Sequence, residues 1–147
     1  MRGAPTGVRQ RGQVAMMFAL VLALVLSGLV ALVGDVILLY DAAGRYDNGA
    51  LVGAQAGSSQ VDSRLLRDGV VVLDTPRAAS TCVDAAITTS GLKAVDVSCT
   101  VSADGHSITA RVSHRVPLLF IVYGPAVAIS RTHTGVVAVG ESQGNSP

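Results

Sequence analysis

The chain has 147 residues, enough for one modest domain and an anchor, and its formal net charge at pH 7 is +1. This near-neutral balance lacks the basic footprint of a nucleic-acid-binding protein, so we expect no nucleic-acid partner. Half of the residues are hydrophobic, yet only 14% are charged, below the roughly 25% usual in soluble domains. Such a deficit fits a chain that spends part of its length in lipid.

An apolar run near the N-terminus is the strongest feature. No residue between Arg11 and Asp35 is charged, and Val14 to Val33 is nearly all aliphatic. About 20 helical residues span about 30 Å, the thickness of bilayer hydrocarbon. A cleaved signal peptide has a shorter apolar region and a small-x-small cleavage site, and no convincing site follows here. We predict one membrane-spanning helix, with a cleaved signal or a buried soluble helix as alternatives.

The flanking charges predict the orientation of this helix. Basic residues precede it and mostly acidic residues follow it: Arg2, Arg9 and Arg11 before, and Asp35, Asp41, Asp47 and Arg45 after. The positive-inside rule then keeps the N-terminus in the cytoplasm and exports the C-terminal part. Asp35 marks the outer membrane edge, where it either faces water or makes a polar contact between neighbouring subunits.

We expect a basic cytoplasmic N-terminus at residues 1–12, of which residues 1–11 are disordered, and a helix over residues 13–58 that continues beyond the membrane. An amphipathic stripe with 3,4 spacing begins at Val36. Its helix-packing members are Tyr46, Gly49, Gly53 and Gly57. Glycines four residues apart leave one helix face as bare backbone, which lets another helix approach closely, and in an assembly this stripe would pack against like helices of neighbouring subunits. The alternative is that they mark the fraying end of the helix.

Residues 59–140 are predicted to form the exported domain. A short helix is indicated over Val61 to Asp68, and Val70 to Leu73 is either a buried strand or further helix. Thr75, as N-cap, and Pro76, at the first helical position, begin a helix that ends at Gly91.

Alternating apolar and polar residues predict a β-hairpin over residues 94–101 and 107–112, with its turn at 103–105. Residues 117–123 are too short to span a bilayer and form a buried strand, a partner-binding strip or a loop near the membrane. Residues 126–139 predict a third strand and leave room for a fourth, before a disordered tail at 141–147. The fold class is therefore α+β: a long N-terminal transmembrane helix extended outside the membrane, then one helix on three or four antiparallel strands.

The only two cysteines, Cys82 and Cys99, lie in the exported part. A pair in an oxidising compartment predicts a disulfide, here closing a loop of about 18 residues. Two buried free thiols are the alternative. Cys82 lies on the apolar face of its predicted helix and Cys99 on the valine face of its strand, so the bond forms if the helix covers the sheet.

No pattern of catalytic residues stands out. The chain has no P-loop, no G-x-G-x-x-G and no metalloprotease His-Glu motif. His106, His114 and His133 are scattered and lack the spacing of metal ligands. We therefore expect no catalytic residue, no metal, no cofactor, no small-molecule substrate and no enzymatic activity.

The sequence RGQVAMMFAL at residues 11–20 resembles the start of TadE/TadG-like proteins of the bacterial tight-adherence (Flp) pilus system. The likeness continues through Val33-Gly34-Asp35-Val36, Leu39-Tyr40 and the segment rich in Asn, Gly and Ala at residues 48–57. It covers about residues 9–57. Beyond that it is one of architecture, since family members tend to have a small exported domain with strand pairs and often two cysteines.

The resemblance implies a membrane-anchored minor pseudopilin-like or assembly component of the pilus, held in the bacterial inner membrane. Its partners would be other pilus or pseudopilin subunits and assembly-platform proteins. Related pilins are cut after a Gly, here between Gly12 and Gln13, and carry Glu at the fifth position after the cut. Met17 stands there, so the chain is closer to the TadG side, where that Glu is commonly missing, and cleavage stays open.

Two other functions remain as alternatives. The first is a single-span envelope protein whose outer domain binds a ligand or senses the envelope. The second is an anchored enzyme, for which the sequence shows no polar constellation.

Overall fold

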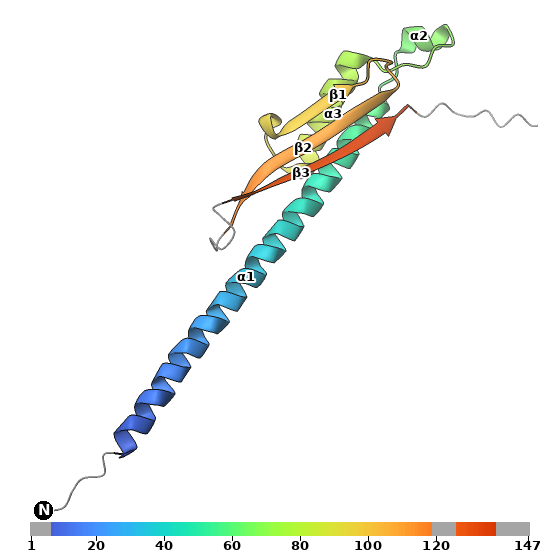
Figure 1. The fold of residues 1–147 in the computed structure, drawn as a ribbon. Helices are drawn as coiled ribbons and strands as arrows, with labels where there is room; N and C mark the ends of the chain where they lie inside the picture. Colours follow the sequence, from blue (N-terminus) through green and yellow to red (C-terminus); the bar gives the residue numbers. More distant parts are fainter. Residues whose placement is uncertain (1–6, 119–125, 138–147) are drawn as a thin grey trace, which may run out of the picture.

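The computed structural model describes residues 7–118 and 126–137, with side chains over 14–118 and 126–137. The elements follow in the order α1 (Gly7–Ser58), α2 (Ser63–Arg67), α3 (Thr75–Ser90), the 3-10 turn η1 (Ala94–Asp96), β1 (Val97–Val101), β2 (Ser107–Pro117) and β3 (Ala126–Val136). A long N-terminal helix thus precedes a small domain with a three-stranded antiparallel sheet (Figure 1). The predicted α+β class is confirmed.

α1 is one unbroken helix of 52 residues, about 78 Å long at the usual rise. It ends at Ser58, where the sequence predicts a stop, but it begins at Gly7, earlier than the expected start near Gln13. Residues 7–11 are therefore helical, which corrects their assignment to a disordered segment. Extending an existing helix costs much less than nucleating one, so a turn that precedes a strong helix joins it readily.

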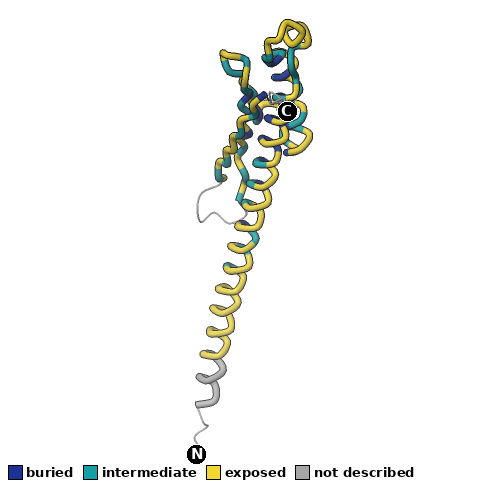
Figure 2. The backbone as a smooth tube through the Cα atoms, turned by 90° about the vertical axis from the view of Figure 1, so that its right-hand side faces the viewer, coloured by how far each residue is buried: buried dark blue, intermediate teal, exposed yellow. Residues whose placement is uncertain are grey.

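The two halves of α1 have different surroundings. In its most apolar 18-residue window, whose mean hydropathy is 2.8, no residue is buried. Further along, Ala42, Tyr46, Ala50 and Ala54 form a buried stripe at every fourth position. Figure 2 shows the exposed N-terminal half leading into the half that the domain covers. α1 is long and apolar enough to cross a membrane, as a single-pass anchor requires.

The sheet has the order β1-β2-β3 and one covered face. Ile108, Ala110 and Val112 of β2 are fully buried, whereas Arg111 and Ser113 on the other face are exposed. Both α3 and the second half of α1 pack on the covered face. The sequence predicted one helix on the sheet, and the structure adds α1 itself as the second.

The boundaries of α3 come from its caps. The Asp74 carboxylate accepts a hydrogen bond from the backbone N–H of Arg77, so Asp74 is the N-cap and Thr75 is the first helical residue. The prediction of Thr75 as N-cap is thus wrong by one position, because the neighbouring Asp74 is also a favoured N-cap residue and ranks above Thr in this role. At the other end, Gly91 has a φ of 70° and closes the helix, as predicted.

The remaining segments differ from the prediction at their ends. Residues 70–73 form neither strand nor helix; Leu73 makes an isolated bridge to Val61 and is buried. Residues 94–96 form η1, so β1 starts at Val97. β2 runs on to Pro117, and residues 126–137 contain a single strand, β3. The predictions for most of 117–123, for a strand beyond residue 137 and for the tail at 141–147 lie outside the described residues.

Candidate functional site

The glycine face of α1, formed by Gly49, Gly53 and Gly57, lies against α3. A Cβ placed on Gly53 would be 2.9 Å from the Ala86 Cβ and 3.0 Å from the Cys82 carbonyl oxygen. Such distances leave no room for a side chain, so the bare backbone permits the contact. The close approach of a helix expected at these glycines is therefore present.

The partner helix, however, belongs to the same chain. The sequence suggested that this stripe packs against helices of neighbouring subunits, whereas α3 already occupies it. This is a correction, with a simple physical reason. A face of small residues predicts that another helix can approach closely. It does not predict whether that helix belongs to the same chain or to another subunit.

β3 meets α1 in a similar way, at a residue that sequence reasoning did not identify. A Cβ on Gly135 would collide with the carbonyl oxygen of Ala54 and lie 3.0 Å from the Ser58 Cβ. The available signal was a glycine inside a β-branched run, which often marks close backbone approach. Gly135 lets the far end of β3 rest directly on α1.

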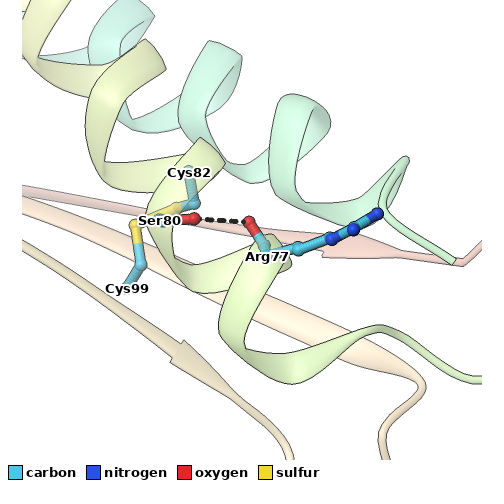
Figure 3. Close-up of a disulfide and its surroundings, with 4 residues drawn as sticks. All are labelled: Arg77, Ser80, Cys82 and Cys99. Carbon is cyan, nitrogen blue, oxygen red and sulfur yellow. Dashed lines mark hydrogen bonds between the residues drawn. A yellow bond between two sulfur atoms is a disulfide. The ribbon is translucent and has the colours of Figure 1, made fainter. Parts of the chain in front are cut away.

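Cys82 and Cys99 form a disulfide, with their Cα atoms 6.2 Å apart. Figure 3 shows the bond joining α3 to β1. Cys82 is fully buried, and Cys99 packs against both clusters of buried residues in the core. Nearby, the Ser80 hydroxyl donates to the Arg77 carbonyl oxygen at 3.0 Å within α3. The disulfide therefore fastens the helix layer to the sheet.

Two histidine–aspartate pairs tie other elements to the sheet. His133 Nε2 of β3 lies 3.0 Å from Asp47 Oδ1 of α1, and His114 Nδ1 of β2 lies 3.1 Å from Asp96 Oδ2 of η1. The His114 ring also meets Tyr46 edge-on, with centroids 6.1 Å apart. From the sequence these histidines were only scattered residues without metal-ligand spacing, because no local pattern links partners so far apart in the chain.

Burial raises the pKa of the Tyr46 hydroxyl; the Arg45 charge opposes this shift and the Asp96 charge adds to it. The two histidine pairs have no residue in common. Within residues 14–118 and 126–137, no group of three or more His, Cys, Asp or Glu side chains is arranged to hold a metal ion. The two histidine–aspartate pairs are contacts between elements of the fold.

Asp35 is buried, with 5% of its surface exposed. The interpretation in which this residue faces water at the membrane edge is therefore wrong. Asp35 lies seven residues before Ala42, which places it on the same face of α1 as the buried stripe. Gly12 and Gln13, the candidate processing site, lie within the first turns of α1.

The part of the domain nearest the apolar half of α1 has an exposed apolar surface, which we call the basal surface. It comprises Val36, Ile37 and Tyr40 of α1 with Val127 and Arg131 of β3. A shallow groove between the two elements is lined by these β3 residues together with Val36, Leu39, Tyr40, Ala43 and Ile129. Tyr40 is 84% exposed.

Comparison of the chain with known protein families, curated protein sequences and solved structures gives no significant match.

Proposed function

We propose that this chain is a membrane-anchored minor pseudopilin-like or assembly component of a tight-adherence (Flp/Tad) pilus and that it acts structurally. The observation behind the proposal is the continuity of α1. One helix provides an exposed apolar half and, without a break, the spine of a disulfide-bonded domain. A rigid connection of this kind holds the domain at a set height above the bilayer.

The exposed apolar half of α1 is expected to be buried by contact with lipid or with another protein. Exposed apolar surface of this extent marks contact with lipid or with other proteins. Arg9 and Arg11 before the run and the aspartates after it favour a cytoplasmic N-terminus and an exported domain. The resemblance of residues 9–57 to TadE/TadG-like proteins then favours the inner membrane of a bacterium and pilus subunits or assembly-platform proteins as neighbours.

The structure limits where those neighbours can bind. The glycine face is filled by α3, so subunit contacts fall on the anchor half of α1 or on the outer surface of the domain. A Cβ added at Gly28 or at Gly34, both in the anchor half, would have nothing within 4 Å. Small open residues in a membrane helix are where a second helix can come close.

Photo-crosslinking in the source bacterium tests the proposal. A crosslinking amino acid at Leu24, which is 71% exposed, should give adducts with pilus subunits or assembly-platform proteins, whereas one at the fully buried Ala50 should not. Deleting the gene should also reduce surface pili. Adducts without pilus proteins, together with unchanged piliation in the deletion strain, would refute the pilus role.

A further inference from the structure

We propose that the basal surface is a lipid-contact surface, in which Val36 and Ile37 lie in the headgroup layer of the bilayer that α1 crosses and Tyr40 lies just above them, at the outer edge of that layer. Arg131 lies against a phospholipid phosphate at the same surface. This inference rests on the proposed membrane anchoring and extends it. The anchor alone would allow the domain to stand clear of the lipid; the geometry points instead to contact.

The first argument is height above the membrane. α1 has no break between Val33, the outer end of the apolar run, and Tyr40. At 1.5 Å per residue, Val36 lies about 4.5 Å and Tyr40 about 10 Å beyond Val33 along the helix. The headgroup layer on each side of the hydrocarbon is roughly 5–7 Å thick. The basal surface therefore starts inside that layer, and a tilted helix would bring it lower still.

The second argument is the distribution of burial around α1 at this height. Val36 is 58% and Ile37 is 62% exposed, so their apolar surface continues that of the anchor without a polar interruption. Asp35, between them and the anchor, is instead buried, with 5% of its surface exposed. The Asp35 carboxylate is therefore not exposed on the face of α1 that carries Val36 and Ile37 and would contact lipid. Tyr40 at the upper limit suits the interface, where aromatic rings with a polar tip gather.

The third argument is the position of the Arg131 guanidinium beside the groove of the basal surface. Arg131 lies opposite Val112 in the sheet, on the helix-facing side, and lines the groove beside Tyr40 and Ala43. Arg45 nearby is engaged by Asp41 at 2.6 Å. Among the described residues, Arg131 has no such carboxylate partner. A guanidinium binds phosphate oxygens with two parallel hydrogen bonds, so an anionic headgroup suits this position.

Site-directed quenching in proteoliposomes tests the inference on the full chain. Because the native cysteines are bonded to each other, a fluorophore can be attached selectively to Ile37→Cys, to Val136→Cys or to Leu24→Cys. Val136 is also exposed and apolar, but its neighbour Gly135 rests on Ala54, about 30 Å beyond Val33. A phospholipid with a spin-labelled headgroup should quench the Ile37 label several-fold more than the Val136 label.

The Leu24 label separates failure of the inference from failure of the anchor. If acyl-labelled lipid quenches the Leu24 label while the Ile37 and Val136 labels respond equally weakly to headgroup-labelled lipid, the domain base does not touch lipid and the inference is wrong. In that case protein covers the surface or the domain stands clear of the bilayer. If the Leu24 label is not quenched either, the anchoring on which the inference rests has failed with it.

A charge variant tests the role of Arg131. The Ile37 label should be quenched more strongly by anionic than by zwitterionic headgroup-labelled lipid, and Arg131→Gln should reduce this preference by about fivefold. The matched control is Arg64→Gln, on the short helix α2, which should leave the preference unchanged. An equal preference in both variants would exclude Arg131 as the phosphate ligand.

Discussion

Single residues decide where the elements of this domain begin and turn. Asp74 caps α3 through the Arg77 N–H at 3.3 Å and also approaches the Arg77 guanidinium at 3.5 Å. Asp104 sits in the hairpin turn, where Gly105 adopts a φ of 70° that other residues rarely adopt. Both carboxylates accept hydrogen bonds from backbone N–H groups, and Asp104 also accepts one from the Ser102 hydroxyl.

Replacing Asp74 by Ala should lower the free energy of unfolding by about 1 kcal/mol, because an N–H at the start of α3 loses its acceptor. Thr75→Ala should change it little, since Thr75 lies inside the helix. Chemical unfolding of the full chain in detergent micelles measures both. Asp74→Asn is the control that keeps the cap and removes the charge. A larger effect at Thr75 than at Asp74 would contradict the capping seen here.

The pKa of Asp104 is lowered, first by the Ser102 hydroxyl that donates to its carboxylate and then by the His106 backbone N–H at 3.1 Å. Because its folded pKa lies below its unfolded one, its stabilising contribution is present above the ordinary pKa. That contribution is lost as the pH falls through the lowered value. NMR titration should show the lowered pKa, and Ser102→Ala should shift it upward. Identical titration curves for the two proteins would refute the assignment.

Between elements, backbone proximity and one covalent bond hold the two layers together. α3 lies on the glycine face of α1, β3 approaches α1 at Gly135, and the disulfide connects α3 to β1. With few aromatic residues available, the domain packs small side chains at short distances. Its stability should therefore respond strongly to single added methyl groups at these contacts.

Gly53→Ala and Gly44→Ala form a matched pair on the same helix. Alanine favours a helix over glycine by about 1 kcal/mol at either position. At Gly44 nothing lies within 4 Å, so the variant should gain up to that amount. At Gly53 the new methyl would press on Ala86 and force α3 outward, for a net loss of about 1–3 kcal/mol. Unfolding free energies that rise in both variants would rule out the tight contact.

Loss of the disulfide should lower the free energy of unfolding by about 3 kcal/mol, because the bond closes a loop with a sequence separation of 17. The Cys82→Ala/Cys99→Ala double variant and the reduced wild type should show similarly lowered thermal midpoints. The single Cys82→Ser variant should be at least as unstable, since Cys82 is fully buried and the hydroxyl would be unpaired. A midpoint unchanged by reduction would contradict the prediction.

At the scale of the whole molecule, α1 connects a part suited to lipid with a domain suited to water. Cleavage after Gly12, as in related pilins, would change how the protein is held in the membrane. A Glu five positions after a cut at Gly12 could pair with the new N-terminus of another subunit, and Met17 cannot.

We therefore expect the protein purified from membranes to retain its full length, or to lack Met1 alone. Intact mass spectrometry measures this directly. The mass of a chain that begins at Gln13 would instead indicate prepilin-type processing despite Met17. That result would favour a subunit of the filament over an assembly component. The mass of a chain that begins after the apolar run would show that the apolar segment is cleaved off and does not anchor the protein.

Several features of this protein could be predicted from the sequence because they depend on residues near each other in the chain. The apolar run, the end of α1 at Ser58, the end of α3 at Gly91 and the alternation of β1 and β2 all follow from local periodicity, turns and caps. The pairing of Cys82 with Cys99 could be predicted from two cysteines in a part of the chain expected to be exported, on the inward faces of a predicted helix and a predicted strand.

Only the tertiary structure decided which surfaces meet. It placed α3 on Gly53, β3 on Ala54, and His133 on Asp47, which lies 86 residues away in the chain. It also turned Asp35 inward. These contacts depend on how separate segments pack together and on the free energy of that packing. Local sequence patterns do not predict which segments will meet. Local sequence determined the elements, whereas long-range packing decided their partners.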